Sequence, residues 1–249
     1  MSKSDAFEAL NAGAKSNVLI LCDHASNRVP SAVNGGSLGI SEADMNRHIA
    51  FDIGARETAL RLAEALKAPM LASRFSRLVI DPNRGEDDPT ILMKIYDHTI
   101  IEANRHADAA EKQRRIEGYH RPYHAAIDAA LSEVVSHGET PVLISIHSYT
   151  PQLNGRPKRP WHVGVLWDDD ARIPVPLMEK LRANPEIVVG NNEPYSGELR
   201  GDTMYFHASK NGYPHVLIEL RHDLIDTSEG QAKWAAILAK PLAEIIKTL

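Results

Sequence analysis

The chain has 249 residues, of which 43% are hydrophobic and 24% charged, and its formal net charge is -5. These values are ordinary for a globular domain, and the negative charge argues against nucleic acid or an anionic membrane as a partner. No apolar run approaches the roughly 20 residues of a membrane span, and residues 1–16 lack the apolar core of a signal peptide. The single cysteine, Cys22, has no partner for an internal disulfide, so the cytoplasm is the expected location.

Short apolar runs alternate with helical patterns along the chain. Strands are predicted at residues 18–22, 70–73, 78–81, 142–146, 162–167, 187–189 and 216–219. Helices are predicted at residues 52–68, 97–115, 122–136, 175–183, 203–210 and 228–249, the last interrupted at Pro241. We therefore predict an α/β fold in which residues 1–249 form a single three-layer domain with a phosphorylase/hydrolase-like architecture. Its mostly parallel mixed sheet is covered by helices on both faces, and residues 1–16 are a peripheral segment.

In such sheets the ligand binds beyond the carboxyl ends of the strands. Four apolar runs end in polar segments of the kind that carry chemistry. In chain order these segments are CDHASN, DPNRGEDD, IHSYTPQ and IELRHD. We expect the functional site to lie where they meet.

His24 follows the first buried run, and His147 follows the central one. A neutral imidazole is the commonest zinc ligand, and a catalytic zinc site usually has three protein ligands and a water. A single histidine at such a position is more often a hydrogen-bonded structural residue. Two histidines at strand ends, with a carboxylate at a third, favour a metal site.

Glu219 ends the last apolar run, where an unpaired carboxylate is costly. It is a candidate zinc ligand, a candidate general base, or one half of an ion pair with Arg221, which is the simplest interpretation. Because the two residues are two positions apart on a strand, they share a face. An acid and a cation aimed at one pocket also suit amide hydrolysis, since one accepts a proton and the other holds an anion.

Arg84 is the best candidate for binding a substrate carboxylate, because a guanidinium grips a carboxylate through two parallel hydrogen bonds. A surface salt bridge with one of the acidic residues 86–88 is an equally good interpretation. The neighbouring Asn83 is a candidate donor to a developing oxyanion.

Two further segments are candidates for the walls of a pocket. Residues 119–124 read YHRPYH, and we interpret them as a helix start with side chains such as His124 facing the pocket, since Pro122 disfavours a regular helix there. Residues 192–202, which include Tyr195 and Arg200, form a turn-rich stretch that we interpret as a substrate-covering loop. The sequence has no Walker loop, GxSxG elbow or GxGxxG motif, which argues against phosphate, serine-hydrolase and dinucleotide chemistry.

Seven segments carry a resemblance to a known family when they are taken in order. They are CDHASNRVP, AFDIGA, SRLVIDPNR, GYHRPYH, IHSYTP, NEPYSG and VLIELR. Together they resemble the N-formylglutamate amidohydrolases, which are in turn similar to the zinc carboxypeptidases and aspartoacylases. The resemblance runs from about Val18 to Arg221. It implies an enzyme that uses one divalent metal ion, zinc, to cut the amide bond of a small carboxylated substrate, with N-formyl-L-glutamate as the first candidate.

The resemblance also implies roles for single residues. The segment around His147 is similar to the one that carries the third metal ligand of carboxypeptidases, and Glu219 looks like their catalytic glutamate. Asn83 would then stabilise the oxyanion. Arg84, with Arg200 or Arg221, would bind the substrate carboxylate.

The sequence departs from the carboxypeptidase pattern at Asn27, three residues after His24, where those enzymes have a glutamate ligand. An amide oxygen is a poor zinc ligand beside a carboxylate. The third ligand is therefore expected to be Asp52, with Asn27 as the alternative. Asp23 and Asp81 are better placed to orient a histidine.

Two other interpretations are open. The same fold could act as a carboxypeptidase-like peptidase or acylase on another small carboxylated substrate, or it could bind such a metabolite without cleaving it. A binding protein needs no base, so the combination of His24, His147 and Glu219 favours the enzyme.

Overall fold

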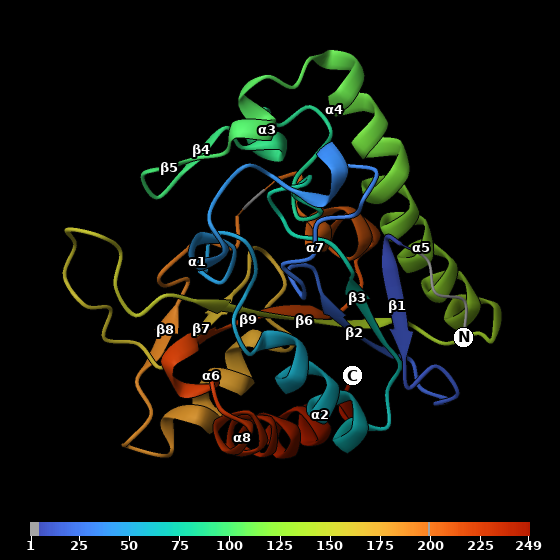
Figure 1. The fold of residues 1–249 in the computed structure, drawn as a ribbon. Helices are drawn as coiled ribbons and strands as arrows, with labels where there is room; N and C mark the ends of the chain where they lie inside the picture. The colour runs from blue at the N-terminus through green and yellow to red at the C-terminus, as the bar shows by residue number, and fades with distance from the viewer. Residues whose placement is uncertain (1–4, 199) are drawn as a thin grey trace.

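A seven-stranded sheet forms the centre of the computed structural model, which describes residues 5–198 and 200–249 (Figure 1). Its strands are β1 (Phe7–Leu10), β2 (Val18–Cys22), β3 (Met70–Ser73), β6 (Val142–Tyr149), β7 (Val163–Leu166), β8 (Val189–Asn191) and β9 (His215–Arg221). Their order across the sheet is β1-β3-β2-β6-β9-β7-β8. The strands β3, β2, β6 and β9 run parallel, whereas β1 is antiparallel to β3, and β7 is antiparallel to β9 and parallel to β8. The predicted α/β class with a mostly parallel mixed sheet is confirmed.

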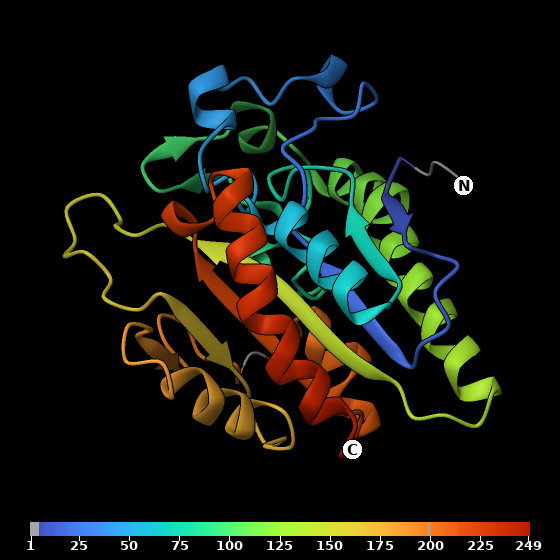
Figure 2. The ribbon, with the colours of Figure 1, turned by 90° about the horizontal axis from the view of Figure 1, so that it is seen from below.

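Helices cover both faces of the sheet. The helices α2 (Ala55–Leu66), α6 (Pro174–Arg182) and α8 (Ser228–Ile246) lie on one face, and α5 (Arg121–Ser136) and α7 (Thr203–His207) lie on the other (Figure 1). Figure 2 shows α2 and α8 side by side across the strands. The alternation of β2 divides its side chains between the two layers: Val18, Ile20 and Cys22 pack beneath α2 and α8, whereas Leu19 and Leu21 pack beneath α5.

A third apolar cluster lies under the short elements above the sheet. These elements are η1 (Asn34–Gly36), α1 (Glu42–Met45), η2 (Pro89–Leu92), the hairpin strands β4 (Ile95–Tyr96) and β5 (Thr99–Ile100), α3 (Glu102–Arg105), α4 (Ala109–Arg115) and the π-helical η3 (Ile116–His120). Two further short turns are η4 (Ser209–Asn211) and η5 (His222–Leu224). The π-helical η3 joins α4 to α5, and Pro122 occupies the first turn of α5, as expected for a helix start.

The predicted strand at residues 78–81 is wrong, because this buried run is a turn. Its carbonyl groups find side-chain donors instead of a neighbouring strand. Asn104 donates to the carbonyl of Leu78 at 2.7 Å, and Arg115 donates to that of Val79 at 3.0 Å. A run of apolar residues predicts burial, but it does not say which groups satisfy the backbone.

The single helix predicted over residues 97–115 is also wrong, because the stretch begins as a hairpin. Asp97 and His98 connect β4 to β5 with φ angles of 39° and 67°, the positive values that a tight two-residue hairpin turn requires. The helical part is then divided at Asp108, whose carboxylate accepts a hydrogen bond from the backbone N–H of Glu111 and caps α4.

The predicted interruption at Pro241 does not occur, since α8 continues through it. An interior proline costs about 3 kcal/mol. Leu238, Leu242 and Ile245 are buried on the same helix, and each contributes about 1.5–3 kcal/mol, which outweighs that cost. None of the described helices is long and apolar enough to cross a membrane. The N-terminal segment contributes an edge strand, β1, that the pattern did not reveal.

Candidate active site

The strand register brings the polar segments CDHASN and IHSYTPQ together. Leu21 of β2 pairs with Ser145 of β6, and two positions further along these strands lie Asp23 and His147. The strand β6 is longer than the sequence predicted, so His147 lies within it and its neighbour on β9 is Glu219. Three central strands of the sheet thus supply the residues around one point.

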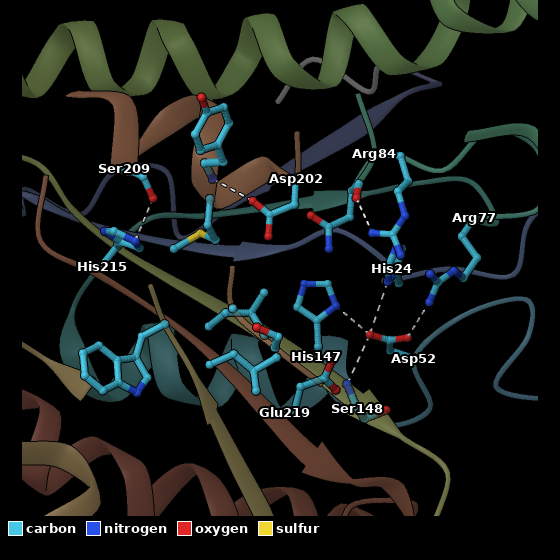
Figure 3. Close-up of a pocket in the computed structure, with 18 residues that line it drawn as sticks. His24, Asp52, Arg77, Arg84, His147, Ser148, Asp202, Ser209, His215 and Glu219 are labelled. Atoms are coloured by element: carbon cyan, nitrogen blue, oxygen red, sulfur yellow. Dashed lines mark hydrogen bonds and ion pairs between the residues drawn. The ribbon is translucent and has the colours of Figure 1, made fainter. Parts of the chain in front are cut away.

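His24, Asp52 and His147 form a fully buried group whose candidate ligand atoms all lie within 4.8 Å of one another (Figure 3). The Asp52 Oδ2 atom is 2.9 Å from Nδ1 of His147 and 3.5 Å from Nδ1 of His24. Asp52 reaches this point because its backbone N–H donates to the carbonyl of His24 at 2.9 Å, just before α2 begins. The chain therefore folds Asp52 back onto the end of β2.

A second carboxylate holds the other nitrogen of each ring, as expected for Asp23 and Asp81. The His24 Nε2 atom is 2.7 Å from Asp81 Oδ1, and His147 Nε2 is 3.0 Å from Asp23 Oδ2. Such carboxylates fix the orientation and tautomer of metal-binding histidines. The partly buried Arg77 bonds to Asp81 at 2.8 Å and lies 3.7 Å from Asp52.

Charge in this group favours a cation. Burial alone raises the pKa of Asp23, but the hydrogen bond and charge of His147 outweigh it and lower this pKa to about 2. The pKa values of Asp52 and Asp81 are lowered in the same way against burial, by His24 and by Arg77 respectively. Burial lowers the pKa of His147, but Asp23 and Asp52 raise it well above its ordinary value.

Three ionised carboxylates, those of Asp23, Asp52 and Asp81, thus surround the two histidines.

The group fits a divalent metal ion. The Nδ1 atom of His24 is buried and has no hydrogen-bond partner among the described residues. It faces the oxygen of Asp52, and Nδ1 of His147 lies beside the same oxygen. Two imidazole nitrogens and one carboxylate oxygen are a donor set that zinc commonly takes in catalytic sites. A metal ion here would take the place of the proton that His147 otherwise holds on Nδ1.

Glu219 lies beside this group and is 8% exposed as a residue. Its Oε2 atom is buried without a hydrogen-bond partner in the described part of the chain. Burial raises the pKa of Glu219 to about 7. On the other side its strand neighbour is Gly164 of β7, where a Cβ would clash with the carbonyl oxygen of Glu193, so a glycine is needed there.

These residues line one pocket with a volume of about 80 Å³. Asn83 and Arg84 also line it. The Asn83 Oδ1 atom accepts a hydrogen bond from the backbone N–H of Thr203 at 2.9 Å, which leaves its Nδ2 for a ligand. The Arg84 side chain is partly exposed and lies 3.9 Å from Asp88, so the expected ion pair is long. Arg84 thus has donors available to a substrate.

The described residues of the stretch 192–202 that line the pocket are not the ones predicted. Ser196, Gly197 and Asp202 line the pocket, whereas Tyr195 stacks against the guanidinium of Arg159 at 5.0 Å. Arg200 is exposed and is not a lining residue. Burial raises the pKa of Asp202 to about 6.

Arg221 and Asn27 are predicted residues that lie outside the pocket lining. The guanidinium of Arg221 bonds to Asp223 at 2.7 Å and to three backbone carbonyls of residues 159–161. Asn27 donates to the carbonyl of Met45 at 3.1 Å, away from the His24–Asp52–His147 group. The structure therefore brings Asp52, and not Asn27, to the two histidines.

His124 belongs to a second histidine group, which is His120, His124 and His207. Its Nε2 atom donates to the carbonyl of Pro82 at 2.9 Å, and its Nδ1 atom lies 2.7 Å from His207 Nε2. His120 Nε2 lies 2.8 Å from the carbonyl of Arg84. The group therefore holds the backbone on either side of Asn83 instead of facing the pocket.

Arg77 and Asp202 are lining residues that the sequence did not single out. Arg77 lies in a turn after β3, and Asp202 caps α7 by accepting a hydrogen bond from the N–H of Tyr205 at 2.7 Å. Asp202 carries a signal that could have been read, since an aspartate before an apolar helical run is a typical cap. Nothing in the sequence around Arg77 indicates its two carboxylate partners.

Comparison with known proteins now decides the family. The sequence model of the N-formylglutamate amidohydrolases matches residues 16–226. The chain belongs to this family. None of the curated proteins matches it. The amidohydrolase class that the residues indicated is therefore supported by a match over most of the chain.

Solved structures of the same fold include one at appreciable sequence identity. A gene product from Agrobacterium tumefaciens is 33% identical, with a TM-score of 0.91 over 98% of this chain and 95% of that one. An N-formylglutamate amidohydrolase from Ralstonia eutropha JMP134 is 21% identical, with a TM-score of 0.72 over 98% of both chains. A bacteriophage poly-gamma-glutamate hydrolase is 10% identical, with a TM-score of 0.51 over 100% of this chain and 93% of that one. The last two show a shared fold.

Proposed function

We propose that this protein is a zinc-dependent amidohydrolase that cleaves the amide bond of an N-formyl or N-acyl amino acid, with N-formyl-L-glutamate as the first substrate to test. One observation carries the proposal. The buried His24–Asp52–His147 group and the unpartnered carboxylate of Glu219 line the same pocket. Membership of the amidohydrolase family supports the reaction class.

The metal would be held by His24, Asp52 and His147, and when bound it polarises the substrate carbonyl group and lowers the pKa of water. Asp23 and Asp81 keep the two imidazole rings in the orientation that this binding needs. The ionised carboxylates of Asp23, Asp52 and Asp81 around the group favour a divalent cation.

Glu219 accepts a proton from the attacking water and returns it to the leaving nitrogen, so that one water is added across the C–N bond. A group whose pKa lies near 7 can both take up and release a proton at neutral pH. Asn83 donates through Nδ2 to the oxyanion that develops on the carbonyl oxygen. Arg84 binds the carboxylate of the amino acid.

Formate release from N-formyl-L-glutamate by the purified protein tests this function. We expect release that disappears after chelation and returns when zinc is added. Undiminished release in chelator would overturn the metal dependence. Absence of release with any divalent metal would overturn N-formyl-L-glutamate as the substrate.

A further inference from the structure

One face of β9 runs along the pocket beyond the catalytic centre. His215, Leu217 and Glu219 alternate along this strand and all three line the pocket. Since a strand rises about 3.3 Å per residue, the path from Glu219 to His215 is about 13 Å long. That is much longer than a formyl group, which adds one carbon to the nitrogen. The pocket therefore extends past the scissile bond.

This extension, which we name the annex, has apolar walls. Leu166 of β7 is the strand neighbour of Leu217 and lines the annex beside it. Met204 of α7 and the side chain of Trp167 complete the walls. Leu166, Leu217 and Met204 are all buried. Buried apolar walls favour an apolar occupant.

The far end of the annex is closed by polar groups that are already paired. His215 Nδ1 lies 2.8 Å from the carbonyl of Tyr213, and its Nε2 lies 3.1 Å from the hydroxyl of Ser209. Two carboxylates, Asp168 and Asp170, lie 3.7 Å and 3.6 Å from the same ring. Asp170 is also paired with Arg172 at 2.6 Å, and the described residues that line this end of the pocket include no arginine or lysine. An anionic group in the annex would lose its hydration without gaining such a partner, so the annex disfavours it.

The cations of the pocket lie at its opposite end. Figure 3 shows Arg77 and Arg84 on one side of His147 and Glu219, and His215 and Ser209 on the other. Arg77 and Arg84 are the only arginine or lysine residues among the described residues that line the pocket. A substrate that places its carboxylate on Arg84 therefore extends its acyl group away from the cations, toward the annex.

We infer that the annex binds the acyl group of the substrate, and that the preferred substrates are N-acyl amino acids with a short, uncharged alkyl acyl chain. The inference rests on the proposed amide hydrolysis and names its substrate class. The acyl carbon lies beside Glu219 and the His24–Asp52–His147 group, and the alkyl chain follows Leu217 toward His215. His215 and Ser209 close the far end of the annex, which limits the chain to a few carbons.

The test is a panel of N-formyl-, N-acetyl-, N-butanoyl- and N-succinyl-L-glutamate, in which the amino acid is constant and only the acyl group changes. Release of glutamate by the zinc-loaded protein gives kcat/KM for each. Each buried methylene favours binding by about fourfold, so we expect N-butanoyl-L-glutamate to exceed N-acetyl-L-glutamate by about tenfold. The anionic succinyl substrate should fall about tenfold or more below the butanoyl one.

Variants of Leu217 link this preference to the annex. Leu217→Ala lengthens the space and should shift the preference toward N-hexanoyl-L-glutamate, whereas Leu217→Phe shortens it and should lower the butanoyl-to-acetyl ratio about tenfold. Leu143→Ala is the matched control, because Leu143 belongs to the same apolar layer without lining the pocket. It should cost similar thermal stability and leave the ratio unchanged. A ratio that Leu217→Ala and Leu143→Ala change equally would overturn the inference.

Failure of the annex differs from failure of the proposed function. Hydrolysis of the formyl substrate with no gain from a longer chain would overturn the annex alone. If no substrate is hydrolysed, the proposed function fails. The shift in melting temperature caused by N-butanoyl-L-glutamate, compared with N-succinyl-L-glutamate, then tests the annex by binding. The inference is supported if N-butanoyl-L-glutamate raises the melting temperature more than N-succinyl-L-glutamate does, and if Leu217→Phe reduces this difference. Equal shifts for the two compounds would overturn it.

Discussion

Two groups of histidines lie on either side of the DPNR segment, and they differ in where their nitrogens point. In the His24–Asp52–His147 group, the Nδ1 atoms turn toward one carboxylate oxygen, and other carboxylates hold the Nε2 atoms. In the second group, His120 and His124 are four residues apart with ring centroids 4.3 Å from each other. Their Nε2 atoms are bonded to the backbone carbonyls of Arg84 and Pro82.

The comparison teaches that close histidines do not by themselves make a metal site. Among the described residues, the ligand atoms of the first group converge with a carboxylate oxygen among them, and two further ionised carboxylates stand behind its histidines. In the second group the histidines act as braces, by which we mean that they hydrogen-bond to backbone carbonyls and hold the backbone in place. Burial, together with the neighbouring rings, lowers the pKa of His124 to about 3. A neutral ring suits a brace, because it can donate with one nitrogen and accept with the other.

The contrast between the two groups would be contradicted most directly if the second group bound the metal. We expect His147→Ala to lose zinc and to lower amide hydrolysis more than thousandfold, because it removes a ligand that no neighbour replaces. His124→Ala should keep a full equivalent of zinc. Metal content by mass spectrometry after dialysis, with turnover measured alongside, checks both. Zinc loss in His124→Ala with retention in His147→Ala would reverse the assignment.

Glu219→Gln separates metal binding by the first group from proton transfer by the carboxylate beside it. The amide is nearly isosteric with the carboxylate but cannot accept the proton, so kcat should fall by about a hundredfold to a thousandfold. Zinc content should stay the same, because Glu219 is outside the ligand group. Near-normal turnover in a folded, zinc-loaded variant would rule out Glu219 as the base.

In the metal-free protein, Glu219 beside the first group and His124 of the second should change the free energy of unfolding with pH in opposite directions. Burial raises the pKa of Glu219 to about 7, so the folded state binds more protons than the unfolded state above the ordinary value of about 4.3. The contribution of Glu219 to the free energy of unfolding is present at low pH. It falls by about 3 kcal/mol as pH rises through 7. Denaturant unfolding of the chelated protein at pH 5, 6 and 7 should show that Glu219→Gln removes this loss.

For His124 the sign is reversed. Its lowered pKa means that the folded state binds fewer protons than the unfolded state below about pH 6.5. The contribution of His124 to the free energy of unfolding is present above pH 6.5. It decreases as pH falls, by about 2 kcal/mol at pH 5. Replacing His124 with Asn should flatten this part of the stability curve and leave the Glu219 part in place. If the free energy of unfolding depended on pH in the same way in Glu219→Gln and in the His124 variant, the two residues would not differ in charge as proposed.

The smallest expected effect concerns Arg84, which lies between the groups. Arg84→Lys keeps the charge but loses the paired hydrogen bonds to a carboxylate, so KM should rise about tenfold to thirtyfold with little change in kcat. Arg200→Lys is the control, since Arg200 is exposed outside the pocket lining. The KM of this control should be unchanged. If both substitutions raise KM equally, Arg84 has no special role in binding.

Sequence reasoning found the sheet and the places where its polar segments meet, but it did less well on elements held by side chains. The run at 78–81 was buried as expected, yet Asn104 and Arg115 satisfy its carbonyls, so it needs no strand partner. The turn at Asp97 and His98 contains no glycine, so the sequence lacks the usual signal for it. Such choices depend on partners far away in the chain, and a local pattern does not contain them.

The sequence by itself determined the alternation of strands and helices, and with it the meeting of His24, His147 and Glu219. Burial patterns are local, and parallel strands bring their carboxyl ends to one edge. Only the tertiary structure decided that Asp52 joins the histidines while Asn27 turns toward Met45. It likewise decided the braces at Pro82 and Arg84 and the apolar annex along β9. These depend on side-chain direction and on competition for hydrogen-bond partners, which are settled when distant segments pack.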